Sequence, residues 1–133
     1  MKLIVGGAYQ GKLGFAVRLA KSTDVADGCS DSLEAALERK IINHLHEYIR
    51  RFCTLEEGDA EAETKRFIET MIEKNGQAVI VCNELGCGIV PAVSSDRMWR
   101  ELTGTACQRL AEQSDEVFRV VCGLPQRLKG GTV

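Results

Sequence analysis

A short apolar run that ends in paired glycines opens the chain, and it restricts the fold more than any other feature. Residues 2–6 (KLIVG) have the composition of a buried strand, and Gly6-Gly7 predict a turn directly after it. A helix is expected to follow from about residue 12 to residue 21. A strand that passes through a glycine turn into a helix is typical of α/β proteins.

Further strand and helix patterns alternate along the first two thirds of the chain. A shorter strand is expected within residues 23–28, and Asp31 with Glu34 resembles a capping box. Apolar residues then recur at helical spacing, which predicts one long amphipathic helix to about residue 52. The acidic stretch 54–63 is interpreted as a solvated connection into the next helix. The apolar face of that helix is formed by Thr64, Phe67, Ile68, Met71 and Ile72, and its stop by Asn75-Gly76.

The last third contains the run expected at the centre of the sheet. Residues 78–82 (AVIVC) are continuously apolar, as in a strand covered on both faces. Glycines and Pro91 predict a loop after it, and a stripe that includes Trp99 predicts a further helix. A last strand is expected at residues 117–123, followed by a basic tail. This alternation indicates a parallel sheet with helices on both faces.

Composition restricts the class of partner. A chain of 133 residues fits one domain with a hydrophobic core, so we expect a single domain over 1–133. The formal charge of −2 and the aromatic content of 5% argue against nucleic acid as a partner. No apolar run approaches the roughly 20 residues of a membrane-spanning helix. We therefore expect a cytoplasmic protein without a membrane span.

The six cysteines do not have the spacing of a disulfide or zinc framework. They are Cys29, Cys53, Cys82, Cys87, Cys107 and Cys122. No C-x-x-C pair occurs, and no histidine is near Cys82 and Cys87 in the sequence to complete a zinc site. Because Cys82 and Cys122 lie inside apolar runs, we predict buried, reduced thiols and no metal ligands.

The glycine turn itself has the spacing G-x-x-x-x-G-K, which is the pattern of a phosphate-binding loop. Its residues are Gly6, Gly7, Ala8, Tyr9, Gln10, Gly11 and Lys12. In such a loop, backbone N–H groups surround a phosphate, the helix amino end adds partial positive charge, and the lysine contacts the outer phosphates. The alternative interpretation is a glycine-rich turn with a surface lysine. The flanking strand and helix favour nucleotide binding.

Leu13 departs from that pattern. The position after the lysine ordinarily supplies a hydroxyl ligand to Mg²⁺, and leucine has no lone pair to donate. Phosphate binding could survive the change, because it uses the backbone and Lys12. A magnesium ion would depend on phosphate oxygens, water and a carboxylate elsewhere in the chain.

A second constellation, in residues 81–91 and 96–129, resembles the carboxyl half of a known family. It comprises Asn83, Glu84, Gly86, Gly88, Val90, Pro91, Trp99, Arg100, Gly104, Gln108, Arg109, Leu110, Asp115, Val117 and Gly123. In this order they resemble the adenosylcobinamide kinase/adenosylcobinamide-phosphate guanylyltransferase family of cobalamin biosynthesis. The resemblance implies an α/β fold of the P-loop type, a three-layer sandwich with a mostly parallel and here reduced sheet.

The resemblance also implies an activity. Family members use GTP or ATP to phosphorylate the corrinoid adenosylcobinamide, and then transfer GMP to the product through a guanylylated histidine. It further implies a homo-oligomer, with a trimer suggested. The resemblance places the acceptor histidine on a helix after the second strand, and the chain has two candidates, His44 and His46. Since residues two apart on a helix point about 200° from each other, we expect that only one of them can face the site.

The magnesium site is expected to be incomplete. The family has a strand that ends in an acidic residue, and residues 51–76 contain no such strand pattern. Glu84, at the end of the AVIVCNE run, is the best remaining carboxylate, either for metal or hydroxyl activation or for hydrogen bonds to the glycine loop. The alternatives to a bifunctional enzyme are a non-catalytic nucleotide-binding or assembly protein of the same fold, and a small kinase for another substrate.

Overall fold

The computed structural model describes residues 1–85 and 94–131, so the loop expected around Pro91 lies outside the described residues. The described chain forms one six-stranded sheet in the order β2-β3-β4-β1-β5-β6. Its strands are β1 (Lys2–Gly6), β2 (Val25–Asp27), β3 (Ile41–Asn43), β4 (Val79–Asn83), β5 (Glu116–Val121) and β6 (Leu124–Lys129). The first five strands are parallel, and β6 is antiparallel to β5.

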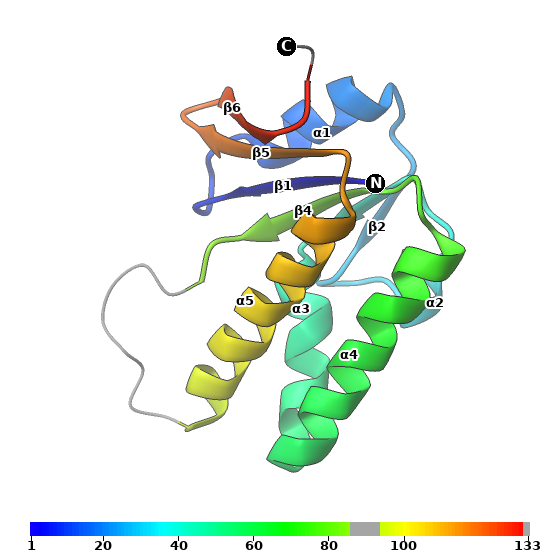
Figure 1. Ribbon diagram of the computed structural model, residues 1–133, viewed down its shortest axis with the longest axis vertical. Helices are drawn as coiled ribbons and strands as arrows, with labels where there is room; N and C mark the ends of the chain where they lie inside the picture. Colours follow the sequence, from blue (N-terminus) through cyan, green and yellow to red (C-terminus); the bar gives the residue numbers. More distant parts are fainter. Residues whose placement is uncertain (86–93, 132–133) are drawn as a thin grey trace.

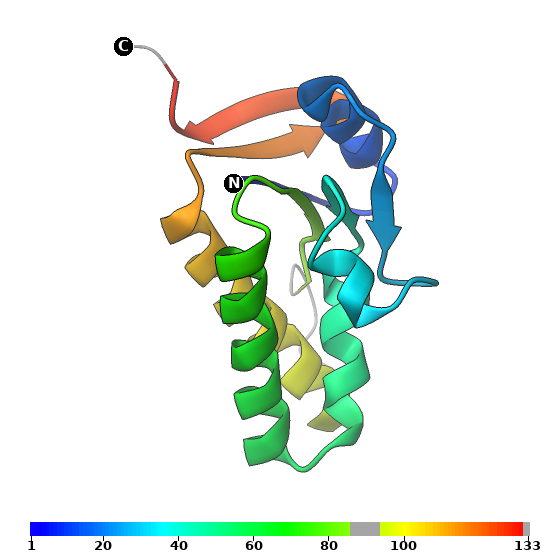
Figure 2. The ribbon, with the colours of Figure 1, turned by 90° about the vertical axis from the view of Figure 1, so that its right-hand side faces the viewer.

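Helices cover both faces of the sheet, as expected for the predicted three-layer sandwich. They are α1 (Lys12–Ala20), α2 (Leu33–Ala36), α3 (Leu45–Arg50), the 3-10 helix η1 (Arg51–Thr54), α4 (Glu57–Lys74) and α5 (Ser94–Gln113). Figure 1 shows α1 on one side of the sheet and α3, α4 and α5 on the other, and Figure 2 shows the same separation from the side. The prediction of a mostly parallel α/β fold is confirmed.

Alternate side chains of the strands build two separate cores. Leu3, Ile42 and Ile80 point to the face of the sheet that is covered by α3, α4 and α5, and they pack in the core there. Ile4 and Val81 pack against the face covered by α1. Because β4 contributes to both cores, its continuous apolar pattern is explained by burial on both faces, and the prediction of a central strand is confirmed.

The long helix predicted to reach residue 52 is wrong. The chain leaves α2 after Ala36, forms β3, and enters α3 only at Leu45. The Asn75 side-chain amide donates to the Ala36 and Arg39 carbonyl oxygens, at 3.0 and 2.8 Å, and so caps the end of α2. Ile41 then pairs with strands on both sides, which offers the β-branched residue more burial than a surface helix would.

Two smaller predictions also need correction, and one segment forms a strand that was not predicted. The helix start near residue 31 is capped by Ser32, whose hydroxyl accepts from Ala35 N–H, whereas Asp31 accepts from Asp27 N–H. The acidic stretch 54–63 is mostly the first two turns of α4, where negative charge favours a helix amino end. The basic tail, for which no element was expected, forms β6.

The cysteine prediction is confirmed in part. All five cysteines within the described residues are free thiols. Cys29 and Cys122 are exposed, however, so the expectation that the thiols are buried is wrong for these two. Within the same part of the chain, no helix has both the length and the apolar character needed to cross a bilayer.

Candidate functional site

The predicted phosphate-binding loop connects β1 to α1 across the carboxyl end of the sheet. Gly11 precedes the helix with φ +90°, a left-handed conformation that a residue with a Cβ rarely adopts. A Cβ at this position would also approach Gly123 Cα to 3.2 Å. The first turn of α1 carries no acidic side chain, so its positive end is not neutralised locally. The local geometry therefore suits an anionic ligand.

Lys12 is buried in this loop, with only 6% of its surface exposed. Its ammonium donates to the Gly7 carbonyl oxygen and is thereby held across the loop. Burial lowers the pKa of Lys12, and the nearby Cys82 and Glu84 act in the opposite direction. A buried cation held by the backbone is not a surface lysine, which favours the phosphate-binding interpretation of the motif.

A cavity of about 490 Å³ brings this loop together with both histidines. It is lined by Ala8, Tyr9, Gln10, Gly11, Lys12, Leu13, Gly14, Cys29, Asn43, His44, His46, Glu47, Val81 and Asn83. The expectation that only one histidine can face the site is wrong. The two rings lie 5.4 Å apart and nearly perpendicular, because His44 precedes α3 in a left-handed conformation with φ +54° and the assumed helical geometry does not apply.

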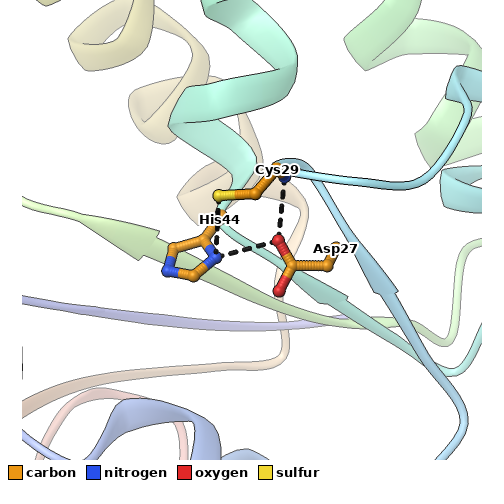
Figure 3. A group of neighbouring side chains, drawn as sticks. All are labelled: Asp27, Cys29 and His44. Atoms are coloured by element: carbon orange, nitrogen blue, oxygen red, sulfur yellow. Dashed lines mark hydrogen bonds and ion pairs between the residues drawn. The ribbon is translucent and has the colours of Figure 1, made fainter.

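His44 is oriented by the carboxylate at the end of β2. Its Nδ1 lies 2.9 Å from Asp27 Oδ1, and we assign the ring proton to Nδ1 because a carboxylate can only accept there. The other Asp27 oxygen accepts from the Asn43 amide at 3.1 Å. In this tautomer the His44 Nε2 has an unprotonated lone pair, and Figure 3 shows that nitrogen on the far side of the ring from Asp27 and Cys29.

His46 adopts the other tautomer, because its Nδ1 accepts a hydrogen bond where that of His44 donates one. It is 3% exposed, and its Nδ1 accepts a hydrogen bond from the Asn83 N–H at 3.2 Å. Burial, with smaller electrostatic contributions from the neighbouring His44 and Lys12, lowers the pKa of His46 to about 4, so the ring is neutral near pH 7. The ring proton is consequently on Nε2. His46 can donate a hydrogen bond into the cavity, but it offers no free ring lone pair there.

Glu84 lies outside the lining of this cavity, and its carboxylate pairs with Arg119 on β5, across the end of β1. Its two oxygens accept from Nε and a terminal nitrogen of Arg119, at 2.7 and 3.2 Å. Its backbone N–H donates to the Gly6 carbonyl oxygen of the loop at 2.8 Å. A catalytic role for Glu84 stays a prediction.

Residues 57–74 are helical, so the expectation that residues 51–76 contain no strand is confirmed. The nearest preceding strand is β3, and its last residue, Asn43, lines the cavity with an amide. Leu13, 38% exposed, lines the same cavity. Among the side chains that line the cavity, Leu13 is apolar and Asn43 is an amide that donates to Asp27.

Sequence reasoning missed Asp27, Cys29 and Asn43 as site residues. Asp27 and Asn43 end neighbouring parallel strands, and the carboxyl ends of such strands meet at one edge of a sheet. The Ile41-Ile42 pair was the available signal for β3, but its spacing also matched the helical pattern around it.

Comparison with known proteins supports the resemblance described above. The family model for cobinamide kinase / cobinamide phosphate guanyltransferase matches residues 30–128. The bifunctional adenosylcobalamin biosynthesis protein CobP of Pseudomonas aeruginosa is 28% identical over 167 residues, covering 96% of this chain and 96% of the relative. That alignment spans more positions than the chain has residues, so the relative contains internal segments without a counterpart here.

Two further relatives match over shorter lengths. Both are named bifunctional adenosylcobalamin biosynthesis protein CobU. The protein of Salmonella typhimurium is 43% identical over 53 residues, covering 40% of this chain and 29% of the relative. The protein of Escherichia coli is 35% identical over 68 residues, covering 51% of this chain and 38% of the relative.

Proposed function

Because the chain belongs to the cobinamide kinase / cobinamide phosphate guanyltransferase family, we propose that it binds GTP or ATP beside Lys12 and transfers phosphoryl and guanylyl groups to a corrinoid. The observation that carries this proposal is that Lys12 and His44 line the same cavity. A phosphate-binding cation and a nucleophilic imidazole in one cavity are the two groups that a nucleotidyl transfer through an enzyme-bound intermediate requires.

His44 is the guanylyl acceptor in this proposal. Its Nε2 lone pair attacks the α-phosphorus of GTP, the bond from that phosphorus to the bridging oxygen breaks, and pyrophosphate leaves. The resulting N–P bond puts a positive charge on the imidazole, which the Asp27 carboxylate at 2.9 Å stabilises. An oxygen of cobinamide phosphate then attacks the same phosphorus, and the N–P bond breaks to return the lone pair to Nε2.

His46 has a different role because its Nδ1 is occupied by the Asn83 N–H. We assign it as a neutral hydrogen-bond donor to the nucleotide through Nε2. The tautomer that the Asn83 contact requires makes His46 the weaker of the two nucleophile candidates. This assignment chooses between two histidines that the sequence could not distinguish.

The kinase step relies in this proposal on Lys12 and the loop backbone. Leu13 has no donor atom, and Asn43 offers a neutral amide oxygen in place of a carboxylate, so neither supplies the hydroxyl or the charged oxygen that usually binds Mg²⁺. No step is therefore assigned to the metal. Glu84 remains the candidate for hydroxyl activation in this proposal, as the carboxylate directly after β4 whose backbone N–H contacts the loop.

Labelling with GTP radioactive at the α-phosphorus tests the guanylyl step. His44→Asn is the informative variant because asparagine tolerates the left-handed backbone that residue 44 adopts, and His46→Gln is its matched control. Acid-labile, base-stable label that is lost in His44→Asn and kept in His46→Gln supports the proposal. The reverse pattern would move the acceptor to His46, and an unlabelled wild-type chain would refute guanylyl transfer.

Nucleotide binding is tested separately by calorimetry with GTP and with ATP. Lys12→Met keeps the buried side-chain length but removes the charge, and we expect at least a tenfold loss of affinity, about 1.4 kcal/mol. Equal affinities for wild type and variant would refute phosphate binding at the loop. Binding without label in any condition would favour the alternative of a non-catalytic nucleotide-binding protein. Phosphorylation of other hydroxyl compounds alone would favour a small kinase.

Two further parts of the proposal concern the protein in solution. We propose a cytoplasmic homo-oligomer, with a trimer as the first arrangement to test. The β6 edge strand, with Leu124 72% and Leu128 56% exposed, supports self-association because it offers apolar surface beside unpaired strand groups. Light scattering at several concentrations measures the mass, and a monomer at all of them would contradict the proposal.

A further inference from the structure

A cluster of three metal-ligating side chains lies at the rim of the cavity. Asp27 and Cys29 come from the end of β2 and the turn after it, and His44 comes from the end of β3 (Figure 3). Cys29 Sγ lies 3.5 Å from His44 Nδ1, and that nitrogen lies 2.9 Å from Asp27 Oδ1. One donor atom from each residue falls within 4.8 Å of the others.

We propose that Asp27, Cys29 and His44 form a zinc-binding site whose fourth coordination position opens toward the cavity. Zinc bonds of about 2.3 Å to sulfur and about 2.1 Å to nitrogen or oxygen, at tetrahedral angles, put ligand atoms roughly 3.5 Å apart. The observed separations differ from that spacing by distances that side-chain rotations can supply. A thiolate with an imidazole favours zinc, whereas Mg²⁺ prefers oxygen ligands.

The surroundings hold these ligands in place. Asp27 Oδ1 accepts from the Cys29 N–H at 2.8 Å, and its other oxygen accepts from Asn43 at 3.1 Å, so the carboxylate has the outer hydrogen bonds typical of a metal ligand. Arg51 clamps the Cys29 turn by donating to the Gly28 and Asp31 carbonyl oxygens, at 2.7 and 2.6 Å. Both Cys29 and His44 also line the cavity, which leaves room for a fourth ligand.

Gly28 makes this proximity feasible. Its amide donates to the Asn43 carbonyl oxygen at 2.9 Å, and a Cβ there would come within 2.2 Å of the His44 carbonyl oxygen. Only glycine therefore lets the Cys29 turn lie against the end of β3. Asp27 and Cys29 precede the residues matched by the family model, which begin at residue 30. The proposed site combines them with His44 from inside that match.

Zinc binding has a chemical consequence for the proposed guanylyl transfer. The metal replaces the proton on His44 Nδ1, so the ring proton moves to Nε2, and the Cys29 thiol releases its proton to solvent. The imidazole then has no free lone pair for attack on phosphorus. Bound zinc and guanylylation of His44 are mutually exclusive. This consequence rests on the proposed function, whereas the metal site itself does not.

Cobalt(II) titration of the full-length chain, without nucleotide, tests the site directly. We expect one cobalt per chain, with a thiolate-to-cobalt charge-transfer band and the intense visible bands of tetrahedral geometry, and displacement by zinc. The charge-transfer band should disappear in Cys29→Ser. It should persist in Cys122→Ser, which removes another exposed thiol. In Asp27→Asn the apparent affinity for cobalt should fall at least tenfold. Circular dichroism checks that each variant is folded.

The results separate failure of the site from failure of the function. No charge-transfer band in the wild-type chain, or the same band in Cys29→Ser, would overturn the zinc site whatever the labelling experiment gives. Where the metal-free chain takes up label from GTP, one equivalent of zinc should abolish it and EDTA should restore it. Undiminished labelling of the zinc-loaded chain would overturn the exclusion between metal and guanylyl group.

Discussion

Acidification should destabilise the protein through His46. Burial lowers the pKa of this imidazole to about 4 in the folded chain, from an ordinary value of 6.5. Between these two values the unfolded chain binds a proton that the folded chain does not. The free energy of unfolding is therefore unaffected by His46 titration above about pH 6.5, and it decreases as the pH falls from 6.5 toward 4.

The size of the effect follows from the shift. Two and a half pH units at about 1.36 kcal/mol each give an upper limit of about 3 kcal/mol, reached below pH 4. At about pH 5 the same linkage gives a loss of roughly 2 kcal/mol relative to about pH 7.5. Losses of this size are a large fraction of the stability of a small domain.

Urea unfolding of wild type and His46→Gln at about pH 7.5, 6 and 5 measures this loss. Glutamine does not titrate, and its side-chain oxygen can still accept from the Asn83 N–H, as His46 Nδ1 does at 3.2 Å. His44 and all carboxylates are common to both chains, so the difference isolates His46. We expect the wild type to lose roughly 2 kcal/mol more than the variant by about pH 5. Parallel pH profiles for the two chains would refute the reasoning.

Three further perturbations test separate parts of the structure. Gly28→Ala places a Cβ 2.2 Å from the His44 carbonyl oxygen, and it should lower the free energy of unfolding in urea by about 2 kcal/mol. Gly58→Ala places a Cβ in open space on α4, and it should raise that free energy by about 0.5–1 kcal/mol. Tyr48→Phe removes a buried hydroxyl that has no hydrogen-bond partner among the described residues, and it should raise the melting temperature, corresponding to about 1 kcal/mol; a lower melting temperature would contradict this. Leu13→Ser adds a hydroxyl to the cavity lining, and calorimetry should then find GTP binding that is tighter with Mg²⁺ than with EDTA.

The sequence correctly predicted those elements whose hydrophobic pattern is compatible with only one kind of secondary structure. The apolar opening and the glycine spacing define β1, the loop and α1, because only a buried strand and a flexible turn have that composition. The continuous run at residues 78–82 could satisfy burial on both faces only at the centre of a sheet. The ordered match of residues along the carboxyl half was sufficient to identify the family.

Errors occurred where local spacing allowed two structures and tertiary packing selected one. Ile41-Ile42 fits a helical stripe as well as a strand, and pairing with β2 and β4 decided for the strand. This single change moved His44 out of a regular helix into a left-handed position beside Asp27. The β6 strand was missed for a related reason. All its residues are exposed, so its sequence has no buried apolar face to predict it, and hydrogen bonding to β5 holds it as a strand.

The candidate site divides in the same way. Sequence alone predicted the glycine loop between β1 and α1, because its pattern depends on the local backbone and on one neighbouring lysine. Phosphate binding by this loop stays a prediction. The tautomers of the two histidines depend on groups distant in the chain, Asp27 for His44 and Asn83 for His46. The sequence thus determined the loop for which phosphate binding is proposed, while only the tertiary structure decided which imidazole has a free lone pair beside it.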